Sequence, residues 1–263
     1  MKIAVLKISG KALNDVLTDD AWINSIKTLQ KSYGGVVIVH GAGRTISEWS
    51  SALGLEVKFH NGQRVTSAGI MEVVAAVQAG VLNAKIVSRL ITSDVDAVGL
   101  TGIDRNTFVA ENVNKDLGFV GIPRQVNSSS WIDELLNKNI VPVFSSVCRD
   151  AEGNLMNVNA DYFTEILAQS LKADSVFFVS DVQGVKLGGS YQHLIDETKI
   201  HEGITKGEIT DGMIPKLNSC VELLNKGISK IWIGSKNPEE MINENNSTKG
   251  GNTSGTWVVH HSA

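Results

Sequence analysis

Three basic residues stand where they could act on a ligand rich in phosphate or carboxylate groups. Lys7 lies within the apolar run Ile3 to Ile8, and Arg64 comes just ahead of a long predicted helix. Lys216 follows Pro215 in the first turn of another predicted helix. A cation there opposes the helix dipole by roughly 0.3–1 kcal/mol, which an exposed lysine tolerates but which also suggests a functional role.

A polar junction between an apolar run and a helix supplies carboxylate and amide groups. Met156-Asn157-Val158-Asn159-Ala160-Asp161 follows the run 140–144 and precedes the helical pattern 162–172. Asn and Asp favour such junctions because their side chains bond backbone N–H groups. The plain alternative is therefore that Asn159 or Asp161 only caps the next helix.

Glycine turns follow three of the predicted strands. They are Lys7-Ile8-Ser9-Gly10, His40-Gly41-Ala42-Gly43 and Ser180-Asp181-Val182-Gln183-Gly184-Val185. Glycine lets backbone N–H groups approach an anion closely, although it is also a common connector. In open α/β sheets, ligands lie beyond the carboxyl ends of the strands, so these turns predict an anion-binding mouth.

The elements that must position these residues alternate between buried strands and helices. We predict strands at 3–8, 36–39, 95–100, 140–147, 175–179, 230–234 and 256–259, the last closing the sheet. Helices are predicted at 19–33, 69–91, 130–138, 162–172, 198–208 and 215–225. Strands buried on both faces and alternating with helices are typical of an α/β protein with a parallel sheet.

Composition excludes several other classes of protein. A length of 263 residues suits one large domain or two lobes that share a sheet, and a net charge of −4 argues against a general nucleic-acid binder. Cys148 and Cys220 are too few for a disulfide scaffold and read as reduced thiols of a cytosolic protein. The histidines do not cluster, so no metal site is predicted. No apolar stretch reaches the roughly 18 residues of a membrane span, so no membrane is expected.

The remaining inventory suits phosphoryl transfer. The sequence has no P-loop, no protein-kinase catalytic loop, no Gly-x-Ser-x-Gly elbow and no zinc-ligand spacing. Phosphoryl transfer needs little covalent help and much placement of charge. Lys7 and Lys216 on two sides of a moving phosphoryl group would neutralise its charge, and Asp161 between them would hold both ammonium groups. Whether the three meet in space is for the structure to decide.

At this point several motifs, in order along the chain, resemble those of the amino-acid kinase family, and within it the branch that acts on acylated glutamate. The motifs are Lys7-Ile8-Ser9-Gly10, His40-Gly41-Ala42-Gly43, Asn61-Gly62-Gln63-Arg64-Val65-Thr66, Asn157-Val158-Asn159-Ala160-Asp161, Ser180-Asp181-Val182-Gln183-Gly184-Val185 and Thr210-Asp211-Gly212-Met213-Ile214-Pro215-Lys216. They cover nearly the whole chain. The Asn-Val-Asn-Ala-Asp and Asn-Gly-x-Arg-Val-Thr blocks are the most specific.

The resemblance implies a three-layer αβα fold with a mainly parallel central sheet. Residues 1–172 would form an N-terminal lobe for the acyl amino acid, and residues 173–263 a C-terminal lobe for ATP and its Mg²⁺. Lys7 and Lys216 would stabilise the transition state, oriented by Asp161. Substrate would be held by Gly10, Gly41, Ala42, Arg64 and Asn157. The nucleotide would be held by Ser180, Asp181, Val182, Gln183, Gly184, Val185, Glu208, Ile209 and Thr210.

By this resemblance the reaction is phosphorylation of the side-chain carboxylate of an N-acyl-L-glutamate, with N-acetyl favoured, in arginine biosynthesis. N-succinylglutamate and acyl-aminoadipate would use the same catalytic residues and stay open. Ser9 and Ala42 stand where many relatives carry glycine, and Ser9-Gly10 also resembles the uridylate kinase branch. A silent amino-acid or nucleotide sensor is the non-enzymatic alternative. The chain starts at its first strand, without the additional helix of arginine-inhibited relatives, from which we expect a cytoplasmic homodimer with weak arginine feedback.

Overall fold

A mainly parallel sheet runs through the protein. The structure is a computed structural model that describes residues 1–10, 12–112, 114–180, 182–210, 213–234 and 255–260. Within those ranges the sheet has eight strands, in the order β14 (Leu194–Asp196), β16 (Gly255–Val259), β15 (Lys230–Gly234), β11 (Ser175–Val179), β1 (Lys2–Ile8), β2 (Gly34–His40), β8 (Val141–Ser145) and β5 (Ala97–Leu100). Neighbours are parallel except β15 and β16. The predicted strands are confirmed, but β16 does not close the sheet, because the unpredicted β14 pairs along its outer side.

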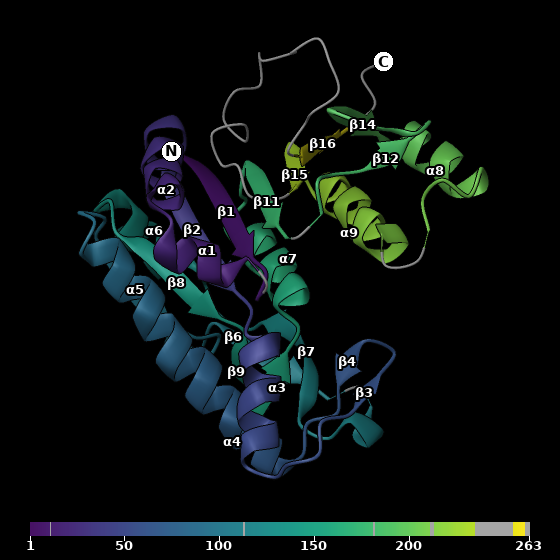
Figure 1. Ribbon diagram of the computed structural model, residues 1–263. Coiled ribbons are helices and arrows are strands. Elements are labelled where there is room, and N and C mark those ends of the chain that lie inside the picture. Colours follow the sequence, from purple (N-terminus) through teal and green to yellow (C-terminus); the bar gives the residue numbers. More distant parts are fainter. Residues whose placement is uncertain (11, 113, 181, 211–212, 235–254, 261–263) are drawn as a thin grey trace.

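Helices cover both faces of the sheet, as predicted, and complete three layers (Figure 1). Alternate residues of a strand point to opposite faces. Ala4, Leu6 and Ile8 of β1 pack with α1 (Leu13–Thr18), α2 (Asp20–Tyr33) and the long helix 68–91. Ile3 and Val5 pack with α6 (Ser130–Asn137), α7 (Ala160–Ser170) and α9 (Met213–Asn225). Since β1 pairs with β2 on one side and β11 on the other, one sheet spans both predicted lobes; the lobe boundary stays a prediction.

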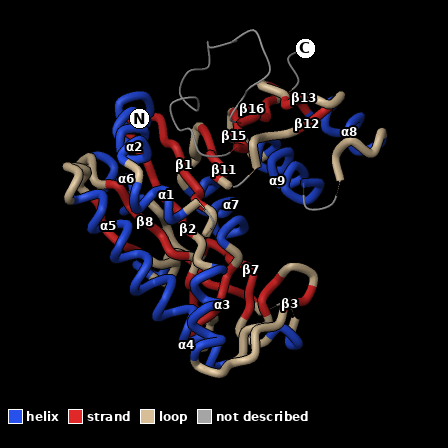
Figure 2. The backbone as a smooth tube through the Cα atoms, in the orientation of Figure 1, coloured by secondary structure: helices blue, strands red, loops and turns tan. Residues whose placement is uncertain are grey.

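The smaller elements lie in two places, one beyond the end of the sheet where β1 and β2 finish and the other beside β15 and β16 (Figure 2). A second sheet has the order β6 (Phe108–Glu111), β7 (Val120–Gln125), β10 (Leu155–Val158) and β9 (Val147–Arg149). One hairpin joins β3 (Phe59–His60) to β4 (Gln63–Arg64), and another joins β12 (Lys186–Leu187) to β13 (Ser190–Tyr191). The remaining helices are α3 (Gly43–Ala52) and α8 (Glu197–Thr205). These pieces supply side chains that the main sheet cannot reach.

The long helix differs from prediction in its middle. It consists of α4 (Ala68–Val74), a π-helical segment (Ala75–Leu82) and α5 (Asn83–Ile91). By length and composition alone the whole helix could cross a membrane, contrary to our expectation that no stretch would. A core helix passes the same test, and here Val74, Val77 and Ile86 are buried in the core against the sheet.

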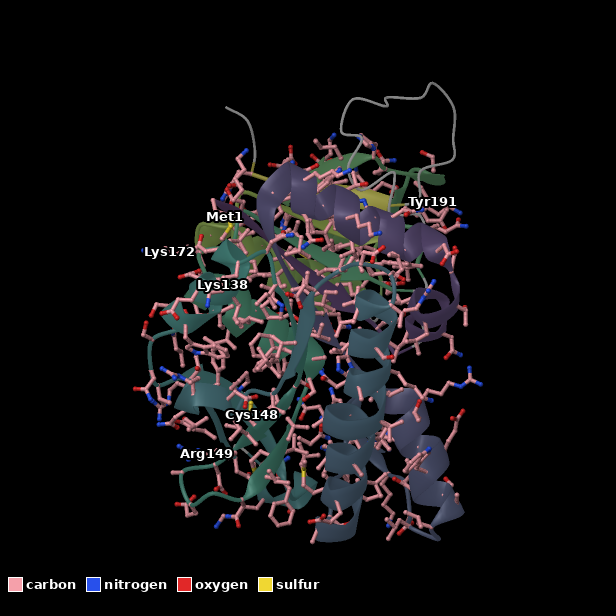
Figure 3. All side chains as sticks on the ribbon, turned by 90° about the vertical axis from the view of Figure 1, so that its left-hand side faces the viewer. Met1, Lys138, Cys148, Arg149, Lys172 and Tyr191 are labelled. Atoms are coloured by element: carbon pink, nitrogen blue, oxygen red, sulfur yellow. The ribbon has the colours of Figure 1, made fainter. Side chains whose placement is uncertain are left out.

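Both cysteines are buried free thiols, in agreement with the sequence-based prediction. Cys148 lies inside the molecule, as its sulfur in Figure 3 shows. Burial raises the pKa of Cys148 to about 12 and also raises that of Cys220. Both side chains therefore act as small apolar groups.

His40, at the end of β2, is a fully buried polar side chain. Burial lowers the pKa of its imidazole to about 4, so the ring is neutral at pH 7. Asn83 fixes the tautomer: its Nδ2 donates to the carbonyl of Val143 at 2.9 Å and also lies 3.1 Å from His40 Nε2, which must accept. The proton is then on Nδ1, which faces the carbonyl of Gly41 at 3.4 Å. The contacts of its buried ring thus fix the position of His40, the residue at which the glycine turn begins.

We predict that His40 makes the free energy of unfolding decrease as the pH is lowered. Between pH 6.5 and about 4 the unfolded chain binds a proton on this ring that the folded protein excludes. From pH 7 to pH 5 the free energy of unfolding should drop by about 2 kcal/mol for this reason. Urea unfolding of the wild type and of His40→Gln at both pH values measures it. An equal drop in the variant would contradict the prediction, since every other group is common to the two proteins.

Candidate active site

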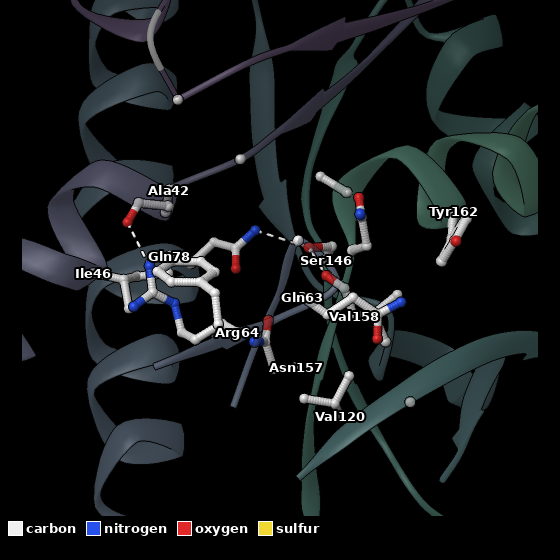
Figure 4. Close-up of a pocket in the computed structure, with 18 of the residues that line it drawn as sticks. Ala42, Ile46, Gln63, Arg64, Gln78, Val120, Ser146, Asn157, Val158 and Tyr162 are labelled. Atoms are coloured by element: carbon white, nitrogen blue, oxygen red, sulfur yellow. Dashed lines mark hydrogen bonds between the residues drawn. The ribbon is translucent and has the colours of Figure 1, made fainter. Parts of the chain in front are cut away.

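A cavity of about 250 Å³ opens beyond the carboxyl ends of β1 and β2 (Figure 4). Its wall comes from the ends of those strands, the first turns of α3 and α7, the β3–β4 hairpin and the second sheet. Six of the residues that line it were predicted to bind substrate or to act in catalysis: Lys7, Gly10, Gly41, Ala42, Arg64 and Asn157. Six predicted residues that are far apart in sequence therefore share one cavity, as the parallel sheet requires.

Lys7 and Asp161 form an ion pair at this cavity. Lys7 Nζ lies 2.6 Å from Asp161 Oδ1, and the lysine side chain is only 11% exposed. Lys7 is held in the middle of the sheet, between Val39 and Phe178. The helix cap expected at this junction is also present, because Asn159 caps α7 by accepting from the N–H of Asp161 at 2.8 Å. The cap leaves the Asp161 carboxylate available to the lysine.

The two glycine turns lie against each other at the wall of the cavity. A methyl group added at Gly10 would lie 3.3 Å from the N of Gly43, and one at Gly41 would lie 3.5 Å from the N of Gly10. The N–H of Gly41 donates to the carbonyl of Ile8 at 3.0 Å, so this group already has an acceptor. Ala42 has φ of −147°, which any residue adopts, so alanine costs no backbone strain here. N–H groups of Gly10 and Ala42 have no acceptor among the described residues.

Arg64 is a buried guanidinium of which only Nη2 has hydrogen-bond partners in the described part of the chain. Nη2 donates to the carbonyl of Gly43 at 2.7 Å and to Ser47 Oγ at 2.8 Å, and the group stacks 4.8 Å from the ring centre of Phe59. Nη1 is buried without a partner in the described part of the chain. Burial lowers the pKa of Arg64, yet an arginine stays charged in proteins. A buried positive donor that faces a cavity suits a carboxylate ligand.

Asn157 stands opposite Arg64 and is oriented by Thr66. Thr66 Oγ1 donates to the carbonyl of Arg64 at 2.9 Å, so it must accept from Asn157 Nδ2 at 3.0 Å. The arrangement ties β10 to the hairpin strand that carries Arg64.

Lys216 lies on α9, outside the described wall of this cavity. The pKa of Cys220 is raised mainly by burial, lowered by Lys216 and raised by Glu165 and Asp161. The charges of α9 and α7 thus act on the same buried thiol, and the two helices are neighbours. A meeting of Lys216 with the phosphoryl group stays a prediction.

A second cavity, of about 450 Å³, gathers most of the predicted nucleotide residues. Its lining includes Val182, Gln183, Gly184, Val185, Glu208, Ile209 and Thr210, joined by Lys186, Tyr191 and Met213. Ser180 lies beside this wall, buried, with its Oγ 3.5 Å from the N–H of Val182. Asp181 lies outside the described residues. Gly184 has φ of +118°, a conformation that favours glycine.

The sequence analysis missed several lining residues, above all Gln78 and Ser146. Both are buried polar side chains. A signal for Gln78 existed, because it is the one polar residue in the otherwise apolar stretch 73–79. In the described ranges, no group of three or more His, Cys, Asp or Glu side chains could hold a metal ion.

Comparison with known proteins decides the family. Residues 2–235 match the amino acid kinase family. The chain belongs to this family. It is 36% identical over 235 residues to an acetylglutamate kinase of Chlorobaculum tepidum, covering 88% of this chain and 82% of that one. An acetylglutamate kinase of Clostridium acetobutylicum is 33% identical, with 92% and 86% covered.

Solved structures share this fold. A Streptococcus mutans protein has a TM-score of 0.80 and 29% identity over 98% of this chain and 99% of that one. A carbamate kinase from Giardia lamblia bound to AMP-PNP has a TM-score of 0.65 at 15% identity, with 99% of each chain covered. The latter likeness concerns the fold alone.

We predict that Lys7 and Asp161 stabilise the fold as a coupled pair. A double-mutant cycle of Lys7→Met and Asp161→Asn should give a coupling energy of about 1–2 kcal/mol, moderated by the exposure of Asp161. The matched control is the exposed pair Arg44 and Glu48, which should couple by no more than about 0.5 kcal/mol. Equal coupling in the two cycles, measured by urea unfolding, would show that burial adds nothing.

Proposed function

We propose that this protein transfers the γ-phosphoryl group of ATP to the side-chain carboxylate of N-acetyl-L-glutamate, an early step of arginine synthesis. The observation that carries the proposal is the first cavity. It is lined by Lys7, a buried lysine paired with Asp161, and by Arg64, a guanidinium whose Nη1 has no partner in the described part of the chain. Acetylglutamate kinases are 33–36% identical to this chain over most of its length, and the activity that their name describes matches this chemistry.

In the proposed reaction the substrate's side-chain carboxylate oxygen forms a bond to the γ-phosphorus. The bond from that phosphorus to the β,γ-bridging oxygen breaks, so the products are an acyl phosphate and ADP. Arg64 holds the α-carboxylate through Nη1, and Asn157 lies beside it. The ammonium of Lys7 and the N–H groups of Gly10 and Ala42 stabilise the charge that spreads over the transferring oxygens. Lys216 acts from the leaving-group side, and Asp161 orients both lysines.

The second cavity would hold the nucleotide. Val182, Tyr191 and Met213 offer apolar surface to a planar base, while Gln183, Glu208 and Thr210 offer polar groups to its ring nitrogens and ribose. Mg²⁺ would arrive with the nucleotide and would neutralise part of the charge of its phosphate groups. The lobe division at 172/173, the homodimer and the cytoplasmic location remain part of the proposal.

The alternatives differ in the acceptor. N-succinylglutamate and acyl-aminoadipate present the same carboxylate and amide, so they compete directly with N-acetylglutamate for this assignment. Uridylate would have to place both a phosphate and a base in a cavity of about 250 Å³, whose lining includes Arg64, Val120 and Ile122. A silent sensor would not need the buried Lys7–Asp161 pair.

A hydroxamate-trapping assay tests the function. N-acetylglutamate, N-succinylglutamate and N-acetyl-aminoadipate should be compared with glutamate and with UMP, the last followed by ADP release. We expect an acylated glutamate to be phosphorylated best, and Lys216→Met to lower its kcat by about 10²–10³. The matched control is Lys206→Met, which removes an exposed lysine that precedes Thr210 in the sequence, whereas Lys216 follows it. Equal rates for glutamate and its acylated forms would refute the substrate assignment, and an unchanged kcat would remove Lys216 from the mechanism.

Gly184 tests the nucleotide cavity separately. An added Cβ would lie 2.6 Å from Thr256 Oγ1, which already accepts from the N–H of Val185 and donates to the carbonyl of Gln192. Gly184→Ala should therefore raise the KM for ATP about tenfold and leave the KM of the acyl substrate unchanged. Gly153→Ala carries the same kind of strain, with φ of +95°, but meets nothing within 4 Å. A similar KM for ATP in both variants would argue against this location of the nucleotide.

A further inference from the structure

Gln78 occupies the floor of the first cavity. Its side chain leaves the π-helical segment of the long helix and lies beside Ser146 (Figure 4). The residue is 3% exposed, so its amide is almost fully withdrawn from water. A buried amide without hydrogen bonds is costly, which makes the direction of each bond informative.

The amide nitrogen of Gln78 is committed to the protein. Nε2 lies 3.1 Å from the carbonyl oxygen of His40, which can only accept. Nε2 also lies 2.9 Å from Ser146 Oγ, and Ser146 donates its own proton to the carbonyl of Val158 at 2.7 Å. Ser146 must therefore accept from Gln78. Both amide hydrogens are used, and the nitrogen cannot exchange places with the oxygen.

The π-helical geometry explains how the amide reaches this place. An α-helix turns about 100° per residue, so side chains five apart diverge. A π-helix closes i to i+5 hydrogen bonds, which brings residues five apart onto one face. Gln78 and Asn83 are five apart, and both contact His40, one at its carbonyl and the other at its ring. The helix thus delivers two amides to one buried histidine.

The oxygen of Gln78 is left as a pure acceptor on the cavity. It has no donor among the described residues and is not one of the fully buried unpartnered atoms, so it keeps some exposed surface. Asn157 differs, because only one of its two amide hydrogens is used, by Thr66. Asn157 can still donate to a carboxylate, whereas Gln78 would repel one.

We propose that Gln78 Oε1 accepts a hydrogen bond from the amide N–H of the substrate and so determines specificity for an N-acylated amino acid. The inference rests on the proposed function. An N-acylglutamate at neutral pH has two carboxylates, one amide carbonyl and a single N–H donor. The carboxylates go to Arg64 and to the N–H groups of the glycine turns, and the single donor goes to Gln78 Oε1, a side-chain acceptor that has no donor partner among the described residues.

The test compares N-acetylglutamate with 2-acetoxyglutarate, the ester in which oxygen replaces the N–H. Rates are followed by ADP release, because hydroxylamine would attack the ester. The wild type should prefer the amide by about 30-fold in kcat/KM, since the ester leaves Gln78 Oε1 unpaired and facing another oxygen. The preference should appear in KM more than in kcat, because the N–H is remote from the reacting carboxylate.

Gln78→Leu removes the acceptor and should reduce the preference to about threefold or less. Ser146→Ala is the matched control: it disturbs the same network but leaves Gln78 held by His40, so the preference should persist. If Gln78→Leu does not fold, the ratio of kcat/KM for the amide to that for the ester, measured in the wild type and in Ser146→Ala, still tests the proposal.

A wild-type ratio near one, or an unchanged ratio in folded Gln78→Leu, would overturn the assignment of Gln78 while leaving the proposed function intact. Failure of the wild type to phosphorylate any N-acylglutamate would overturn the proposed function, and the role of Gln78 with it.

Discussion

The structure around the candidate active site depends on one buried ion pair, between Lys7 on the innermost strand and Asp161 on the first turn of α7. An ammonium group that is almost fully withdrawn from water must have a carboxylate partner, because an isolated buried charge is too costly. The strand and the helix must therefore keep their relative position. The Asn159 cap supports this arrangement, since it satisfies the N–H of Asp161 and fixes where the helix begins.

A second set of constraints lies beneath the cavity, where neutral polar groups replace charges. His40, Gln78, Asn83 and Ser146 bond to one another and to backbone carbonyls of three strands. A satisfied buried network is rigid, because every broken bond would leave a polar group unpaired. The glycine turn after β2 and the junction after β10 are thereby held by the same side chains. The floor of the cavity is held in place by amides, a hydroxyl and a neutral imidazole rather than by charged groups.

The sheet explains why two cavities can serve one reaction. β1 lies between β2, which leads to the first cavity, and β11, which leads toward the second. Parallel neighbours end at the same edge, so ligands bound beyond β1, β2 and β11 approach each other.

The sequence by itself determined the order of strands and helices, since buried strands and amphipathic helices differ in the period of their apolar residues. It also drew attention to Lys7, to Arg64 and to the junction that contains Asp161, because charged and polar residues beside apolar elements are conspicuous, whereas the substrate role predicted for Asn157 came from the family resemblance. It did not determine that Lys7 meets Asp161, that Arg64 Nη1 has no partner in the described part of the chain, or that Gln78 is acceptor-only. Those facts depend on which atoms of separate elements face each other. Tertiary structure decided them, because hydrogen-bond direction and burial are set by partners that no local pattern names.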